Sequence, residues 1–104
     1  MNRYKGGIMP ACMTIWNGDE SFNAKGQEKY VRWLLDNGAN GLSVCGSTGE
    51  NIAMTMDEQK KVIETVCRYV DGEVPVYAGT GRYTTAHTIE LTRFAASCGA
   101  EGAM

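Results

Sequence analysis

The sequence holds one histidine, His87, and no two of its four cysteines are separated by only two residues. Structural zinc sites place cysteine and histidine ligands at short, fixed spacings, and small disulfide frameworks crowd many cysteines into a short chain. Neither arrangement is present in these 104 residues. We therefore expect no metal site and no disulfides, with the cysteine thiols reduced and buried.

Long apolar runs and an excess of charge of either sign are also lacking. Twelve acidic and ten basic residues give a net charge of −2, and the basic residues are scattered along the chain. A nucleic-acid surface needs clustered positive charge, whereas a membrane span or a signal peptide needs a long apolar segment. The sequence thus predicts a cytoplasmic protein with no nucleic-acid partner and no membrane segment.

The glycine motifs that bind nucleotides are missing as well. A dinucleotide-binding fold places Gly-x-Gly-x-x-Gly after its first strand, whereas residues 16–19 here read Trp-Asn-Gly-Asp. The glycine-rich stretches at 46–49 and 79–81 carry no lysine, so neither is a phosphate-binding P-loop. We expect no cofactor.

What the sequence does contain is a regular alternation of short apolar runs and helical patterns. Strands are predicted at 8–14, 42–45, 74–78 and from about residue 102 onward. Helices are predicted at 24–36, 55–70 and 85–97. This alternation is typical of parallel βαβ units. The fold class is therefore α/β, and we expect residues 1–104 to form a partial domain, the first three and a half units of a (β/α)8 TIM barrel of about 250 residues.

The helix ends carry specific signals. Thr55 and Glu58 have the spacing of a capping box, and Gly99 follows the third helix. The second helix is expected to bury Val62, Ile63, Val66, Cys67 and Val70. The third helix is expected to supply the core with Ala86, Ile89, Phe94, Ala95 and Cys98.

The strongest candidate for a functional site is the turn after the second strand. Residues 46–50 read Gly-Ser-Thr-Gly-Glu, so Gly46 and Gly49 flank two hydroxyl side chains. Glycines can adopt positive φ, which lets backbone N–H groups converge on a carboxylate or phosphate, and Ser47 and Thr48 add further donors. A plain strand-to-helix turn has the same composition, so this alternative stays open from the turn alone.

Residues at the other strand ends extend this candidate site. Thr14 and Thr80 are hydroxyl residues at the ends of the first and third predicted strands, and a barrel brings its strand ends to one rim. Cys45 directly precedes the Gly-rich turn, but the single histidine is distant in sequence, so no base for a nucleophilic thiol is evident. We expect Cys45 to pack in the core.

Together these stretches resemble a known family. The turn at 46–50, the residues Gly-Ala-Asn-Gly-Leu before it at 38–42, the capping box and the stretch Pro-Val-Tyr-Ala-Gly-Thr-Gly at 75–81 are similar to the N-terminal part of the dihydrodipicolinate synthase and N-acetylneuraminate lyase family. The resemblance covers essentially the whole chain. It implies a TIM barrel, a homo-oligomer that is usually tetrameric, and class I aldolase chemistry, in which a lysine forms a Schiff base with pyruvate and the resulting enamine attacks or releases an aldehyde.

The resemblance also implies roles for the residues of the first turn. Thr48 corresponds to the donor that holds the pyruvate carboxylate, helped by backbone amides of the turn between Gly46 and Gly49. Ser47 corresponds to the hydroxyl of the proton relay, at a position where the synthases typically have threonine. Glu50 would be structural, with its carboxylate fixing the turn by accepting nearby N–H bonds, and the alternative is an ordinary surface acid at a helix start.

In the second turn, Gly79 and Thr80 would line the floor of the same pocket. Tyr83 and His87, which follow shortly after, are expected to be solvated residues at the start of a helix. The first strand departs from the family pattern, because residues 12–15 read Cys-Met-Thr-Ile where the family usually has Thr-Pro.

The Schiff-base lysine and the catalytic tyrosine of the family correspond to positions beyond Met104. The chain's own lysines are Lys5, Lys25, Lys29, Lys60 and Lys61, and none is at a predicted strand end. We therefore expect residues 1–104 alone to be inactive. Within the family the resemblance favours the synthase branch, which joins pyruvate to aspartate semialdehyde in lysine biosynthesis. A sialic acid lyase, favoured by Ser47, and a non-catalytic half-barrel are the alternatives.

Overall fold

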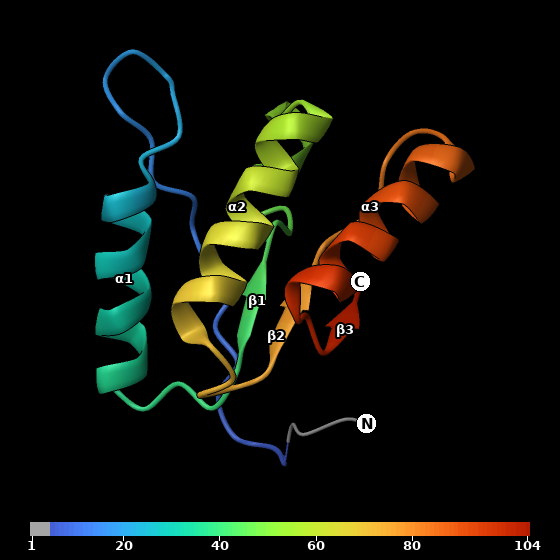
Figure 1. Cartoon of the computed structure of the whole chain (residues 1–104). Helices are drawn as coiled ribbons and strands as arrows, with labels where there is room; N and C mark the ends of the chain where they lie inside the picture. The colour runs from blue at the N-terminus through green and yellow to red at the C-terminus, as the bar shows by residue number, and fades with distance from the viewer. Residues whose placement is uncertain (1–4) are drawn as a thin grey trace.

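The structure is a computed structural model and describes residues 5–104. Its helices and strands follow one another as α1 (Ala24–Asp36), β1 (Leu42–Val44), the 3-10 helix η1 (Asn51–Ala53), α2 (Met56–Val70), β2 (Val76–Ala78), α3 (Thr85–Cys98) and β3 (Gly102–Ala103). The strands form one parallel sheet in the order β1-β2-β3, and the three helices cover one face of it (Figure 1). The predicted α/β alternation is confirmed.

The first predicted strand, at 8–14, is the main correction. This segment runs beside β1, but only Ala11 pairs, in a single parallel bridge with Ser43. The bridge is closed by Cys12 N–H to Ser43 O at 2.8 Å and by Ser43 N–H to Pro10 O at 3.1 Å. Pro10 has no N–H with which to extend the ladder at one end. At the other end Cys45, with φ 58°, turns the β1 chain out of the extended conformation.

The helix ends agree with the sequence signals. In the capping box, Glu58 N–H donates to Thr55 Oγ1 at 3.1 Å, and Thr55 N–H donates to Glu58 Oε1 at 2.9 Å. Gly99, with φ 99°, ends α3 in the left-handed conformation that glycine adopts without strain. The strands β1 and β2 are shorter than predicted, because Cys45 leaves the extended conformation and Pro75 cannot donate.

The core lies between the helices and the sheet. All five residues predicted for the buried face of α2 are buried. The prediction for α3 is confirmed for Ala95, which is buried, but it is wrong for Ala86 and Ile89, which are exposed, and it omitted the buried Leu91. Small and apolar residues of α3 occur on several sides of the helix, so its sequence pattern did not identify one buried face. Ile89 lies about 200° around the helix from Leu91. Phe94 and Cys98 are half-buried.

This arrangement brings the strand ends together. The loop before α1, the segment between β1 and α2, and the loop between β2 and α3 all lie at the end of the molecule toward which the strands point (Figure 1). Among residues 5–104, no helix is long and apolar enough to cross a membrane.

Candidate functional site

The turn at 46–50 is compact and is held together by hydrogen bonds to its own backbone carbonyl groups. Gly46 O accepts from Gly49 N–H at 3.1 Å and from Asn51 N–H at 3.3 Å, while Glu50 N–H donates to Ser47 O at 3.0 Å. Ser47 and Thr48 lie exposed at its tip. Within residues 5–104, the backbone N–H groups of Ser47 and Thr48 have no hydrogen-bond acceptor.

The glycines of this turn do not adopt the positive φ that their composition led us to expect. Positive φ occurs at the residues on either side, Cys45 (58°) and Glu50 (64°), and not at Gly46 or Gly49. Gly49 lies in a tight space, since a Cβ there would lie 3.0 Å from Cys12 O and fit only if the backbone shifted by a few tenths of an ångström. Side chains in the left-handed region are costly and often mark functional turns. The strain at Cys45 and Glu50 is therefore a feature of the candidate site.

Thr14 fixes this turn from the neighbouring segment. It is 7% exposed, and its hydroxyl donates to Gly49 O at 2.7 Å. The sequence had placed Thr14 at the same rim because it ends the first apolar run. The structure therefore brings the end of that run into direct contact with the Gly-rich turn.

Glu50 reaches across to the same neighbouring segment. Its Oε2 accepts from the indole Nε1–H of Trp16 at 3.0 Å, and the carboxylate lies at the surface. Together with Glu20, Ala53 and Glu58, these two side chains line an open cleft of about 370 Å³. Glu50 therefore accepts an N–H bond from an indole outside its own turn.

The second turn lies directly against the first. Gly79 N–H donates to Val44 O at 2.7 Å, and a Cβ on Gly79 would lie 2.1 Å from Cys45 O, so no other residue fits without displacing the backbone. Thr80 is 2% exposed. Its Oγ1 accepts from the hydroxyl of Thr92 at 2.7 Å, so Thr80 lies under the rim and turns its hydroxyl toward α3.

Cys45 packs as the sequence predicted. Its side chain is 1% exposed, and its Sγ lies 3.9 Å from Gln59 O. Burial, followed by the proximity of Cys12, raises the pKa of the Cys45 thiol to about 12. The thiol is therefore protonated near neutral pH, and it is not a nucleophile.

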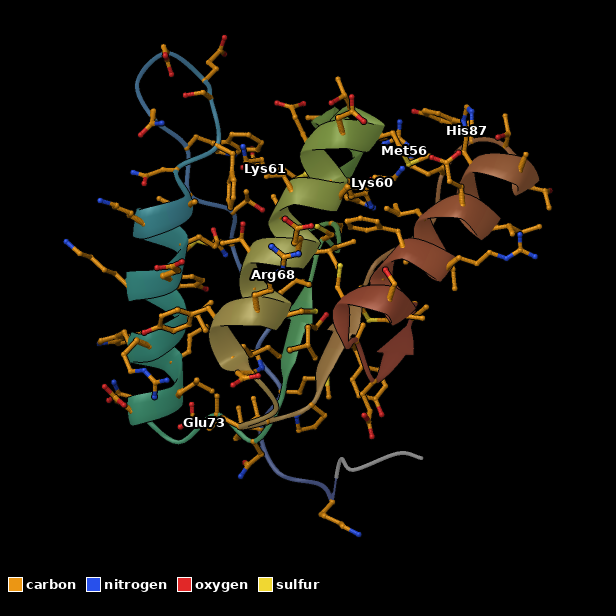
Figure 2. All side chains as sticks on the ribbon, viewed as in Figure 1. Met56, Lys60, Lys61, Arg68, Glu73 and His87 are labelled. Carbon is orange, nitrogen blue, oxygen red and sulfur yellow. The ribbon has the colours of Figure 1, made fainter. Side chains whose placement is uncertain are left out.

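The remaining candidates lie on the surface. Tyr83 is 89% exposed, as expected. His87 is also exposed, at the start of α3 (Figure 2). Lys60 and Lys61 lie on α2 (Figure 2). Lys60 Nζ pairs with Glu90 Oε2 at 2.7 Å. Neither of these two lysines is at a strand end.

A second cleft at this end of the molecule, of about 360 Å³, lies between η1 and the loop after β2. It is lined by Asn51, Ile52, Met54, Gly81, Arg82 and Tyr83. Within residues 5–104, Ser47, Thr48 and Thr80 line none of the described clefts. No group of three His, Cys, Asp or Glu side chains in this range could hold a metal ion.

Sequence reasoning missed two residues of this site, Gln59 and Arg82. Gln59 is fully buried on α2 and donates from Nε2 to Gly79 O at 2.8 Å. Arg82 Nη1 donates to Gln59 Oε1 at 3.1 Å and to Met54 O at 2.9 Å. One signal was available, because Gln59 stands one turn before Val62 and so falls on the apolar face of the helix.

Comparison with known proteins gives these features a context. The model of the dihydrodipicolinate synthetase family matches residues 4–104. A curated 4-hydroxy-tetrahydrodipicolinate synthase of Methanoculleus marisnigri is 41% identical over 100 residues, which are 94% of this chain and 34% of that protein. The crystal structure of dihydrodipicolinate synthase DapA-2 from Bacillus anthracis has a TM-score of 0.92 at 34% identity, covering 100% of this chain and 35% of that one.

A third similar protein was solved with a ligand. YagE, a prophage protein of the dihydrodipicolinic acid synthase family from E. coli K12 in complex with pyruvate, has a TM-score of 0.91 at 34% identity, over 93% of this chain and 33% of that one. The chain thus spans about a third of the length of the relatives it matches. Its α/β fold matches the N-terminal part of their TIM barrel, which confirms the predicted fold class.

Proposed function

This chain belongs to the dihydrodipicolinate synthetase family, and we propose that it supplies the carboxylate-binding rim of a pyruvate-dependent Schiff-base lyase, a 4-hydroxy-tetrahydrodipicolinate synthase that joins pyruvate to aspartate semialdehyde. The observation that carries the proposal is the turn at 46–50. It presents two exposed hydroxyls and two backbone N–H groups without acceptors in residues 5–104, at the end of a buried parallel strand. Such a turn suits a carboxylate.

The roles within the turn follow from what each group can do. Thr48 and the amides between Gly46 and Gly49 hold the carboxylate of pyruvate. Ser47 passes protons to and from the reacting centre, since a hydroxyl can both donate and accept. Glu50 and Gly79 are structural, through the bond to Trp16 and the close approach to Cys45. Thr80 lies below the strand ends and supports the floor of the proposed pyruvate pocket.

The chemistry also needs an amine that is desolvated, because only the neutral amine attacks a carbonyl. The lysines of the described chain lie in helices or, for Lys5, before the first strand segment, and Lys60 is held in an ion pair. We propose that the Schiff-base lysine is supplied by strands that these 104 residues do not contain, and that residues 1–104 are inactive by themselves. Self-association and a cytoplasmic location belong to the same proposal.

A second candidate is cleavage of a sialic acid, which uses the same pyruvate site. Ser47 favours it, because the synthase branch typically has threonine at this position. A structure of CdNal from Clostridium difficile in complex with mannosamine has a TM-score of 0.91 at 29% identity to this chain. The pyruvate end of the site is common to both candidates.

A chimera tests the proposal. Residues 1–104 replace the corresponding third of the Methanoculleus marisnigri relative, which contributes the remaining strands. We expect pyruvate and borohydride to give one stable adduct per chimera chain, and the chimera to condense pyruvate with aspartate semialdehyde. The 104-residue chain alone should give no adduct.

The chimera is also offered N-acetylneuraminate, and cleavage of this substrate in preference to the condensation would establish the second candidate. A folded chimera with neither activity and no adduct contradicts the pyruvate-lyase proposal. A stoichiometric adduct on residues 1–104 alone contradicts the assignment of the lysine to missing strands. The unmodified relative is the positive control.

A further inference from the structure

Gln59 has an unusual environment for a glutamine. Its side chain is 0% exposed, although glutamine is mostly found at the surface. Both ends of the amide are used, because Nε2 donates to Gly79 O at 2.8 Å and Oε1 accepts from Arg82 Nη1 at 3.1 Å. Both partners lie in the turn that follows β2. A residue of α2, the helix before β2, therefore holds the loop after that strand.

The same group of contacts reaches the segment after β1. Arg82 Nη1 also donates to Met54 O at 2.9 Å, just beyond η1. The thiol of Cys45, at the end of β1, contacts the backbone carbonyl oxygen of Gln59 at 3.9 Å, so this contact does not involve the Gln59 side chain. Gln59 and Arg82 therefore connect the segment 45–54 to the turn 79–82.

A comparison among the three helices shows that this arrangement is specific. Gln59 is the fourth residue after the N-cap of α2, and Gln27 and Thr88 have the same position in α1 and α3. Gln27 accepts from Ile15 N–H at 2.8 Å and donates to Met13 O at 3.0 Å. Thr88 Oγ1 accepts from Arg82 N–H at 3.0 Å. Gln27 and Thr88 each hold the loop before their own helix, whereas Gln59 crosses to the neighbouring strand end.

We infer that Gln59, acting with Arg82, is a positioning residue that sets the turn 46–50 and the turn 79–81 at a fixed separation. It does so through hydrogen bonds to the backbone and to Arg82, without touching substrate. The inference rests on the proposed function, in which the turn 46–50 binds pyruvate and the turn 79–81 supports the pocket from below. The amide of Gln59 would be costly to bury without hydrogen-bond partners. The arrangement in which it bonds Gly79 O and Arg82 is therefore strongly preferred.

Amide hydrogen exchange of the 104-residue chain, followed by mass spectrometry, tests the inference. Gln59→Leu keeps the approximate volume and removes both hydrogen bonds. We expect exchange to become about tenfold faster in segments 45–54 and 79–84, with 62–70 nearly unchanged. Gln27→Leu is the matched control, because it makes the same change at the same helix position. It should speed exchange near 13–15 and leave 79–84 unchanged.

Two further variants separate the two bonds. Gln59→Glu keeps an acceptor for Arg82 but has no proton for Gly79 O when ionised, so 79–81 should exchange faster while 51–54 stays protected. Arg82→Ala should have the opposite effect, with faster exchange in 51–54 and continued protection of 79–81. Arg82 is half-buried, so this variant provides the measurement even where Gln59→Leu does not fold.

A uniform increase over all segments, or the same pattern in Gln59→Leu and Gln27→Leu, would show that Gln59 only fills the core, and it would overturn the positioning role. The exchange pattern is measured without pyruvate. An inactive chimera therefore overturns the proposed function alone, and a uniform exchange pattern overturns the inference alone.

Discussion

Ser47 and Thr48 are neighbours with the same chemical group, but their proposed roles predict different kinetic effects. Thr48→Val in the chimera keeps the shape and removes one donor to the carboxylate. We expect pyruvate affinity to fall by about 1–3 kcal/mol, the usual cost of leaving a charged partner without its hydrogen bond. Titration of the chimera with pyruvate measures this change.

Ser47→Ala is the counterpart in the same turn. Loss of a proton-relay hydroxyl should lower kcat more than it changes the affinity for pyruvate. Steady-state kinetics of the two variants, measured side by side, separate binding from proton transfer. Unchanged constants in both variants would mean that the turn serves only to connect β1 to η1.

The buried thiol of Cys45 predicts a dependence of stability on alkaline pH. Burial raises its pKa from 9.0 to about 12, so the folded state keeps the proton that the unfolded state loses. The resulting stabilisation is complete below about pH 9 and is lost as the pH rises toward 12. Between about pH 9 and 11, the free energy of unfolding should fall by about 1.4 kcal/mol per pH unit more in the unchanged chain than in Cys45→Ala.

Denaturant unfolding at several pH values measures this difference in slope. Cys98→Ala is the control, because Cys98 is only partly buried and its pKa is raised less. Equal slopes in the unchanged chain and in Cys45→Ala would contradict the burial of the Cys45 thiol.

At the scale of elements, the contact between the ends of β1 and β2 predicts a contrast between two glycines. Gly79→Ala places a Cβ about 2 Å from Cys45 O, which forces the two turns apart, and overpacking of this kind typically costs about 1–3 kcal/mol or more. Gly81→Ala has open space and an ordinary φ, so it should be neutral or stabilising by up to about 1 kcal/mol. Thermal unfolding of the two variants gives the comparison, and equal effects would contradict the close approach.

Elements with local signals were predictable from the sequence. The capping box placed the start of α2, and Gly99 placed the end of α3, because these residues act on the turn they belong to. The pairing of the segment 8–14 was not predictable from the sequence, because Pro10 and the conformation of Cys45 limit it to one bridge at Ala11.

The same distinction holds for the candidate site. The sequence predicted the two turns, since glycine and hydroxyl residues at strand ends are visible along the chain. It did not predict that Arg82 would bond Gln59 and Met54, because these contacts join residues 23 and 28 positions apart in different elements. It also did not predict which apolar residues of α3 are buried, because that depends on how the helix rests on α2 and the sheet.

At the scale of the whole molecule, the sheet has one covered face and one open face. The three helices lie on the same side (Figure 1). On β1, Leu42 and Val44 are buried, while Ser43 between them is half-buried and its Oγ lies 3.4 Å from Met104 Sδ. Met13 is 51% exposed and Met104 is 54% exposed. Apolar side chains are thus accessible beside both outer strands of the described sheet. A chain of this size buries only part of its apolar surface on folding, so exposed apolar side chains of this kind favour association.

We therefore expect the 104-residue chain to associate with itself at micromolar concentration, because sheet edges with unpaired N–H and C=O groups and accessible apolar side chains favour pairing between chains. Sedimentation velocity over a range of concentrations measures the association. The double variant Met13→Glu with Met104→Glu should shift the chain toward monomer, since charge beside a strand edge opposes pairing. Trp33→Glu is the matched control, because Trp33 is 61% exposed on α1, away from the sheet edges. It should leave the association unchanged. A well-dispersed monomer that resists chymotrypsin and melts sharply would contradict the incomplete barrel and favour a self-contained α/β domain.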